Sequence, residues 1–284
     1  MNKKGILFKL VASAVLLGAA AMAQAETFRL VIMQDEKGAA QKYRPLADYL
    51  KSKGVDVSLI GAPDYVKAAN MFANGEADGM FSGSGVAGSM IVKGVATPEV
   101  RPVGKDGNST YWAVVIAPTG APKFDGTANY FAGKKVLFTS LASAGEIFYH
   151  SLPGSGSVKA TLLKAASHGA AIDALSKGAA DVAIVKNRVW DKEKDKYPGL
   201  AKIGEDNGEN PDNTLIVSKK ANSQTVARIS SILLDLKNDG SAEASAVKDS
   251  LGIREYIKTT DADFQHNFGL LKKAGIDASF NFAF

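Results

Sequence analysis

Two stretches of similar sequence, NGEADGMFSGS at residues 74–84 and KGAADVAIVKN at residues 177–187, follow the same succession of signals. Each has a glycine where a helix ends, then Ala and Asp, then a short apolar strand. Glycine ends helices because it adopts the left-handed conformation after the last turn, and an Asp can cap the turn that leads back into a sheet. The two stretches therefore predict two small α/β lobes of similar construction.

Apolar strands and amphipathic helices alternate around these stretches, which is typical of parallel sheets flanked by helices. Two helices, at 223–237 and 260–274, close the chain, with Ser223 and Thr260 as candidate N-caps. The predicted strands lie at residues 27–33, 55–63, 79–83, 111–118, 133–140, 180–185 and 214–219.

Two of these strands, 111–118 and 214–219, are predicted to carry the chain between the lobes and to act as a hinge. They separate lobe one, residues 26–110 plus 220–284, from lobe two, residues 119–213. An α/β protein binds its ligand at the loops beyond the carboxyl ends of its strands. The cleft between the lobes is therefore the predicted binding site.

The first 25 residues have the pattern of a secretory signal peptide. Lys3, Lys4 and Lys9 flank an apolar run that is too short for a membrane anchor. The run ends at small residues two apart, which predicts cleavage after Ala25 and release into the periplasm. The chain contains no cysteine, so no lipid-modified N-terminal cysteine is expected.

The charge of the chain is nearly balanced, because 34 basic residues, three of them in the leader, stand against 29 acidic ones. This balance indicates neither a nucleic-acid partner nor a membrane surface. His150, His168 and His266 have no spacing typical of a catalytic triad or a zinc site, so no metal or cofactor is expected. A periplasmic hydrolase is the disfavoured rival of a binding protein, and the protein is not expected to be an enzyme.

The segment FSGSGVAG, residues 81–88, has the glycine spacing G-x-G-x-x-G of a dinucleotide-binding turn. That site also needs an acidic residue at a strand end about 20 residues later, and Glu99 falls short of that position. We instead predict a ligand-facing loop, in which Ser82, Ser84 and glycine amides approach a bound solute.

Six segments occur in one order along the chain: YRPLADYL, APDYVKAANMFANGEAD, STYWAVVIAP, GKKVLFTSLASAG, SHGAAIDALSKGAADVAIV and TDADF. Together they resemble the phosphate/phosphite/phosphonate-binding family of periplasmic solute-binding proteins of ABC transporters. The resemblance implies an α/β, two-lobe periplasmic-binding-protein fold of type 2. Each lobe would be a mixed, mostly parallel sheet flanked by helices, and two crossover strands would form the hinge.

The resemblance also implies which residues hold the ligand: Tyr65, Tyr111, a hydroxyl-bearing turn with Ser140 and Ser143, and His168. A helix begins at this turn, and a helix N-terminus suits an oxyanion. Ser143 with Glu146 three residues later is also a capping box, which would close the helix end without a ligand. Both roles of Ser143 stay open at this point.

The turn departs from the family pattern S-T-S-G, because Ala142-Ser143-Ala144-Gly145 lacks two of the three hydroxyl groups. Glu146 adds a negative charge that would repel an oxyanion. Arg188 lies where some family members have a carboxylate for a ligand amine, and an arginine there favours an acidic group. Asp212 is interpreted as a turn residue.

The resemblance implies a periplasmic receptor that captures a small anionic or zwitterionic solute, such as a phosphonate, phosphite or phosphate. Closure of the lobes around the solute would present it to an ABC permease in the inner membrane. The receptor is expected to be a monomer. A sensory receptor of the same fold that presents its ligand to a membrane sensor kinase is the alternative.

Overall fold

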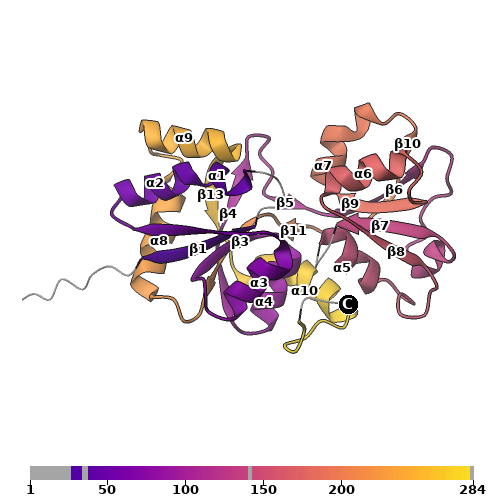
Figure 1. The fold of residues 1–284 in the computed structure, drawn as a ribbon, viewed down its shortest axis with the longest axis horizontal. Coiled ribbons are helices and arrows are strands. Elements are labelled where there is room, and N and C mark those ends of the chain that lie inside the picture. The colour runs from indigo at the N-terminus through magenta and orange to yellow at the C-terminus, as the bar shows by residue number, and fades with distance from the viewer. Residues whose placement is uncertain (1–26, 34–37, 140–142, 282–284) are drawn as a thin grey trace, which may run out of the picture.

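The computed structural model describes residues 27–33, 38–139 and 143–281 as two α/β lobes that lie side by side and are joined by a narrow middle (Figure 1). The predicted signal peptide, its cleavage after Ala25, and Ser140 lie outside these described residues. Within the described ranges, no helix is long and apolar enough to cross a membrane.

The first lobe is built on a six-stranded mixed sheet in the order β13-β4-β12-β3-β1-β2. The strands β1, β2 and β3 run parallel, whereas β12 is antiparallel to β3 and β4, and β13 is antiparallel to β4. The strands are β1 (Phe28–Met33), β2 (Val57–Ala62), β3 (Gly79–Ser82), β4 (Ala96–Gly104), β12 (Thr214–Ser218) and β13 (Ile253–Lys258).

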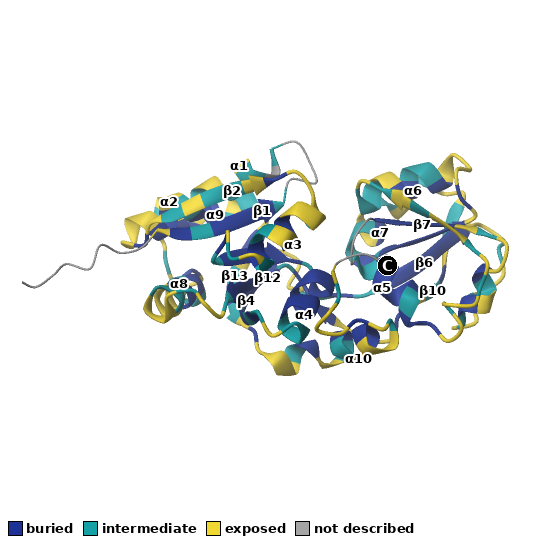
Figure 2. Ribbon diagram, turned by 60° about the horizontal axis from the view of Figure 1, so that its bottom comes forward, coloured by how far each residue is buried: buried dark blue, intermediate teal, exposed yellow. Residues whose placement is uncertain are grey.

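Helices cover both faces of this sheet and bury its apolar side chains (Figure 2). One face packs against α3 (Tyr65–Ala73), α4 (Ser84–Val92) and α10 (Gln265–Lys273). The other packs against α2 (Arg44–Ser52), α8 (Ser223–Asp235) and α9 (Ala242–Leu251). Two short helices complete the lobe: α1 (Ala39–Lys42) and the 3₁₀ helix η3 (Asp261–Phe264).

The second lobe has a five-stranded mixed sheet in the order β10-β6-β9-β7-β8, with β7 parallel to β8 and β9. Its strands are β6 (Ala113–Pro118), β7 (Lys135–Thr139), β8 (Thr161–Ala165), β9 (Val182–Lys186) and β10 (Leu200–Glu205). Its helices are α5 (Ala144–Ser151), α6 (His168–Ser176), α7 (Asn187–Glu193) and the 3₁₀ helices η1 (Ala128–Phe131) and η2 (Lys194–Lys196).

The two similar stretches of sequence form similar structures, one in each lobe. Gly75 and Gly178 follow α3 and α6 with φ angles of 78° and 77°, which supply the expected left-handed turns. The aspartates that follow do not cap these turns. Asp78 accepts a hydrogen bond from the Arg29 amide of β1, and Asp181 accepts one from the Lys135 amide of β7. Each aspartate therefore ties its turn to the first residues of the neighbouring strand.

A short antiparallel ribbon of β5 (Thr110–Tyr111) and β11 (Asn210–Pro211) joins the lobes. The structure differs here from the crossover strands expected at 111–118 and 214–219. Residues 113–118 pair within the second sheet, and residues 214–218 pair within the first. An uninterrupted apolar run does not reveal where a strand leaves the ribbon and enters a sheet, so the linking pair is shorter than the sequence indicates.

The segment 81–88 is not the loop that the sequence predicts. Ser82 ends β3, Gly83 is the N-cap of α4, and Ser84 is the first residue of that helix. A Cβ on Gly88 would lie 2.0 Å from the Asn267 side-chain oxygen of α10, so this glycine lets two helices pack closely.

The prediction of Ser223 as an N-cap is also wrong, since Asn222 caps α8. Thr260 does form a capping box, but on the 3₁₀ helix η3.

Candidate functional site

A cleft of about 930 Å³ lies between the two lobes, at the carboxyl ends of their parallel strands. The first lobe contributes the starts of α3 and α4, and the second contributes the starts of α5, α6 and α7. The ribbon contributes Tyr111, and the chain leaving it contributes Asp212. The cleft is thus bounded by both lobes and by the segments that join them.

Four helices of eight or nine residues begin at this cleft, each a few residues after a parallel strand. They are α3 and α4 from the first lobe and α5 and α6 from the second. The first amide groups of a helix have no partner within the helix, and the helix dipole is positive at that end. Because these helices begin on both sides of the cleft, its walls suit an anion.

Side chains cap three of these helices. Asp64 accepts a hydrogen bond from the Lys67 amide at the start of α3, and Ser167 accepts one from the Ala170 amide of α6. Ser143 lies at the cleft wall and accepts a hydrogen bond of 3.2 Å from the Glu146 amide of α5. Its hydroxyl group donates to the Thr139 carbonyl at 2.7 Å. The N-cap role of Ser143 is therefore present, and its single donor is already used in this structure.

The fourth helix, α4, begins beneath Tyr111 of the ribbon. The Tyr111 hydroxyl accepts a hydrogen bond of 3.1 Å from the Ser84 amide and lies 2.6 Å from the Ser84 hydroxyl. Both side chains are buried, and burial raises the pKa of Tyr111 to about 12. Ser82 donates its hydroxyl hydrogen to the Gly83 carbonyl. The sequence predicts that Ser82 and Ser84 face the cleft, but they do not, because they belong to the buried end of β3 and the buried start of α4.

His168 is the first residue of α6 and lines the cleft. The Lys186 amide donates a hydrogen bond of 3.3 Å to its Nδ1 atom, which therefore carries no proton. Burial, reinforced by the nearby Lys186 charge, lowers the pKa of His168 to about 3. The imidazole is therefore neutral at physiological pH with its proton on Nε2, where it can donate to an anion.

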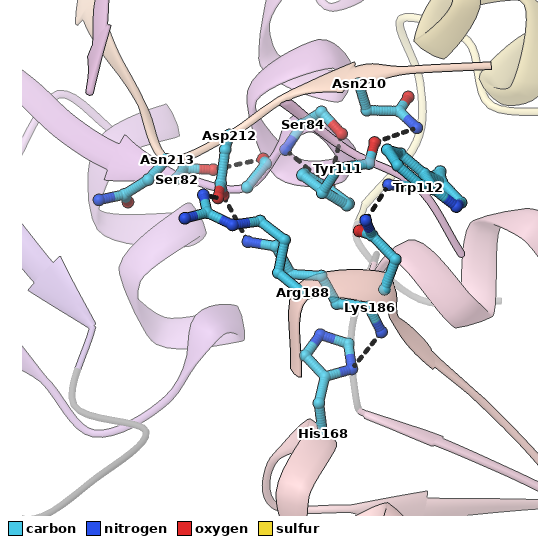
Figure 3. A network of polar contacts seen from close by, with 12 residues as sticks. Ser82, Ser84, Tyr111, Trp112, His168, Lys186, Arg188, Asn210, Asp212 and Asn213 are labelled. Atoms are coloured by element: carbon cyan, nitrogen blue, oxygen red, sulfur yellow. Dashed lines mark hydrogen bonds and ion pairs between the residues drawn. The ribbon is translucent and has the colours of Figure 1, made fainter. Parts of the chain in front are cut away.

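Two cations and two carboxylates form a network on the wall beside His168, named here the Asp212 cluster: Lys186, Arg188, Asp106 and Asp212. Figure 3 shows Lys186, Arg188 and Asp212 of this cluster. Arg188 Nη1 lies 2.7 Å from one Asp212 oxygen, and Lys186 pairs with the other. Burial alone would raise the pKa of Asp212, but the two cations outweigh it and hold the pKa below its usual value.

Sequence reasoning missed three members of this network, and Asp106, which follows β4, is one of them. Asp212 was interpreted as a turn residue, yet its side chain is only 9% exposed and binds two cations. Lys186 was not singled out, although it ends β9 at the same edge of the sheet where β7 and β8 lead to Ser143 and His168. That shared strand edge was the signal that could have found it.

Glu146 is placed differently from the sequence expectation. Its side chain is 2% exposed and pairs with Lys164 of β8 at 3.1 Å, and it does not line the cleft. The expected repulsion of an oxyanion by Glu146 is therefore offset by a neighbouring lysine.

Tyr65 lines the cleft from the first lobe, as predicted for a ligand-facing position. In the part of the chain that the structure describes, no group of three or more His, Cys, Asp or Glu side chains could hold a metal ion.

Comparison with known proteins points to one family. Residues 28–264 match the family model described as the phosphonate-binding periplasmic substrate-binding protein of ABC transporters. No curated protein shows a significant match to the chain.

Solved structures share the two-lobed fold at low sequence identity. PhnD1 from Prochlorococcus marinus, in complex with methylphosphonate, is 14% identical with a TM-score of 0.69, covering 88% of this chain and 99% of that one. A binding-protein component of an ABC phosphonate transporter from Pseudomonas aeruginosa is 16% identical, with a TM-score of 0.66 and coverage of 87% and 86%. XAC2383 from Xanthomonas citri, bound to ATP, is 15% identical, with a TM-score of 0.71 and coverage of 88% and 97%. These similarities confirm the type 2 periplasmic-binding-protein fold.

Proposed function

Because the chain belongs to the family of phosphonate-binding periplasmic substrate-binding proteins of ABC transporters, we propose that its cleft captures a small phosphonate and that the lobes close around it. Proteins of this family bind their substrate in the periplasm and work with the permease of an ABC transporter. The identity of the ligand, the residues that hold it and the closing motion are the parts that we propose.

The observation that carries the proposal is the set of helix N-termini that both lobes bring to one cleft, α3 and α4 from the first and α5 and α6 from the second. A phosphonate has three oxygens and up to two negative charges, so it can accept hydrogen bonds from amides on both sides. A ligand that contacts both lobes stabilises the arrangement in which they lie closest together. The ribbon of β5 and β11 is the proposed hinge, since it is the short pair of strands between two complete sheets.

Named side chains complete the proposed site. His168 offers its Nε2 proton, and its neutral state keeps this donor present across physiological pH. Tyr65 faces the cleft from the opposite lobe, and Arg188 supplies positive charge. Tyr111 and Ser143 are proposed to act mainly by holding the starts of α4 and α5 in place. Such a site holds its ligand without making or breaking a covalent bond, so we propose a transport receptor and not an enzyme. We also propose that this receptor is a monomer.

The proposal is tested by titrating residues 26–284 with methylphosphonate in an isothermal calorimeter, with phosphate, phosphite, sulfate and acetate for comparison. We expect methylphosphonate to bind and His168→Asn to weaken this binding by about 1.5–3 kcal/mol, about tenfold to a hundredfold, because a hydrogen bond to a charged ligand is lost. The asparagine keeps an acceptor for the Lys186 amide.

The control is His150→Asn. Burial lowers the pKa of His150 to about 4, so it is also neutral, but it lies near the end of α5, outside the cleft. This variant should bind methylphosphonate as the parent does. Binding of acetate but of no phosphorus oxyanion would reject a phosphonate receptor, and equal losses in both variants would remove His168 from the site.

A further inference from the structure

The Asp212 cluster leaves no carboxylate oxygen of Asp212 for a ligand. Lys186 Nζ pairs with Oδ1, and Arg188 Nη1 lies 2.7 Å from Oδ2. Asp212 is the buried carboxylate of the cleft wall, with 9% of its side chain exposed. A ligand ammonium group that approached it would have to displace one of these two cations.

Both cations are themselves held in place. Arg188 Nη2 lies 3.3 Å and 3.2 Å from the two oxygens of Asp106, so the guanidinium group is fixed between two carboxylates. Lys186 Nζ lies 4.4 Å from the centre of the Tyr111 ring, where a cation–π interaction adds to its ion pair. Neither cation can therefore leave Asp212 without losing a second contact.

Two further carboxylates line the described part of the cleft and have their own partners. Asp191 of α7 pairs with Lys194 at 3.6 Å, and Glu193 pairs with Lys196 at 2.6 Å. They follow Arg188 by three and five residues along the chain. Among the residues that the structure describes, the wall next to His168 thus presents cationic donors and no carboxylate that lacks a cation.

From this arrangement we infer that the cleft selects phosphonates without an ammonium group and rejects aminoalkylphosphonates, with Lys186 and Arg188 as the specificity-determining residues. The inference rests on the proposed function of the cleft and names its substrate class. An ammonium group here finds both carboxylates of the cluster already paired with Lys186 and Arg188, so it would lose its hydration without gaining a free acceptor, which is strongly unfavourable. An alkyl chain meets a cluster whose charges already balance.

The direct test compares two ligands of nearly equal size by calorimetry. In propylphosphonate a methyl group stands where 2-aminoethylphosphonate has its ammonium group. We expect the parent protein to bind propylphosphonate about tenfold more tightly or better. Equal or tighter binding of 2-aminoethylphosphonate overturns this inference and leaves the proposed function intact. Binding of methylphosphonate but of neither larger ligand also overturns this inference, and binding of none of the three overturns the proposed function with it.

Variants then assign the selectivity to the cluster. Lys186→Met keeps the length of the side chain and frees one Asp212 oxygen, so the ratio of the two affinities should shift at least about fivefold toward 2-aminoethylphosphonate. Lys192→Met is the matched control, because Lys192 lines the cleft on α7 but belongs to no ion pair of the cluster. Its ratio should equal that of the parent. Should Lys186→Met fail to fold, Arg188→Gln frees the other oxygen. An unchanged ratio in a folded variant of either kind overturns the assignment.

Discussion

At His168 the two ring nitrogens have different roles, since Nδ1 accepts a hydrogen bond from the Lys186 amide and Nε2 is the donor that we propose for the ligand. Its pKa is lowered to about 3 in the folded protein, whereas an unfolded chain binds the proton near 6.5. Between these values the unfolded state holds one more proton than the folded state. The free energy of unfolding should therefore fall on acidification, by up to about 1.4 kcal/mol for each pH unit.

Replacing His168 by Asn tests this linkage, because the amide oxygen keeps the acceptor but does not titrate. We expect the free energy of unfolding of His168→Asn, measured in urea between pH 4 and pH 7, to depend less steeply on pH than that of the parent. His150 contributes its own pH dependence equally to both proteins. Parallel pH profiles would show that His168 is protonated as easily in the folded protein as in the unfolded chain.

Of the residues that the family resemblance singled out, Tyr111 and Arg188 line the cleft, and so do three residues at helix starts. Tyr65, Ser143 and His168 stand at or next to the first position of a helix, and all three line the cleft. The sequence does not identify Asp212 and Lys186 as partners, because they are remote from each other along the chain. A local sequence pattern does not show that a lysine and an aspartate 26 residues apart are in contact. Their pairing depends on how the ribbon returns the chain past the end of β9.

Among the elements, α4 shows most clearly why close packing is absent from a sequence pattern. Seven of its nine residues are buried, so it has no polar face and no helical periodicity to recognise. The structure explains Gly88 by its close contact with α10 instead. Strand β4 was missed for a different reason, since Pro98 and Pro102 interrupt its pattern, and its pairing with both neighbours is irregular.

The contact between α4 and α10 gives a prediction for a pair of glycines. In Gly88→Ala the new methyl group would lie 2.0 Å from the Asn267 oxygen and 2.9 Å from Leu271 Cδ1, both on buried side chains. We expect a loss of about 1–3 kcal/mol in the free energy of unfolding, measured in urea.

Gly269→Ala on α10 is the matched control for this prediction. Its Cβ would meet nothing within 4 Å, so better helix propensity should raise the free energy of unfolding by about 0.5–1 kcal/mol. A neutral Gly88→Ala beside a stabilising Gly269→Ala would mean that α10 moves away from α4 at little cost.

For the molecule as a whole, the two lobes touch on both sides of the ribbon. On one side α10 of the first lobe packs against α5 of the second, and His266 lies 2.8 Å from Asp206, which follows β10. At the cleft, Arg188 of the second lobe reaches Asp106, which follows β4 of the first. The first contact includes apolar residues of the core, whereas the second is a partly exposed ion pair. The cleft side is therefore the side that should open most easily.

Asp106→Asn should accordingly shift the ligand-free protein toward wider separations of the lobes. The Asp106 side chain of the pair is exposed, so the pair contributes about 0.2–1 kcal/mol. This is enough to change the ratio of open to closed molecules by up to about fivefold, and the effect should fade at high salt.

The measurement is the distance between spin labels on the two lobes, by double electron–electron resonance. The chain has no cysteine, so Lys51→Cys and Lys123→Cys, at exposed sites of opposite lobes, permit selective labelling. Asp249→Asn is the control, because the ion pair of Asp249 with Lys105 stays within the first lobe. If both variants give the distance distribution of the parent, the Arg188–Asp106 pair does not hold the lobes together, and closure depends on the ligand and on the Asp212 pairs alone.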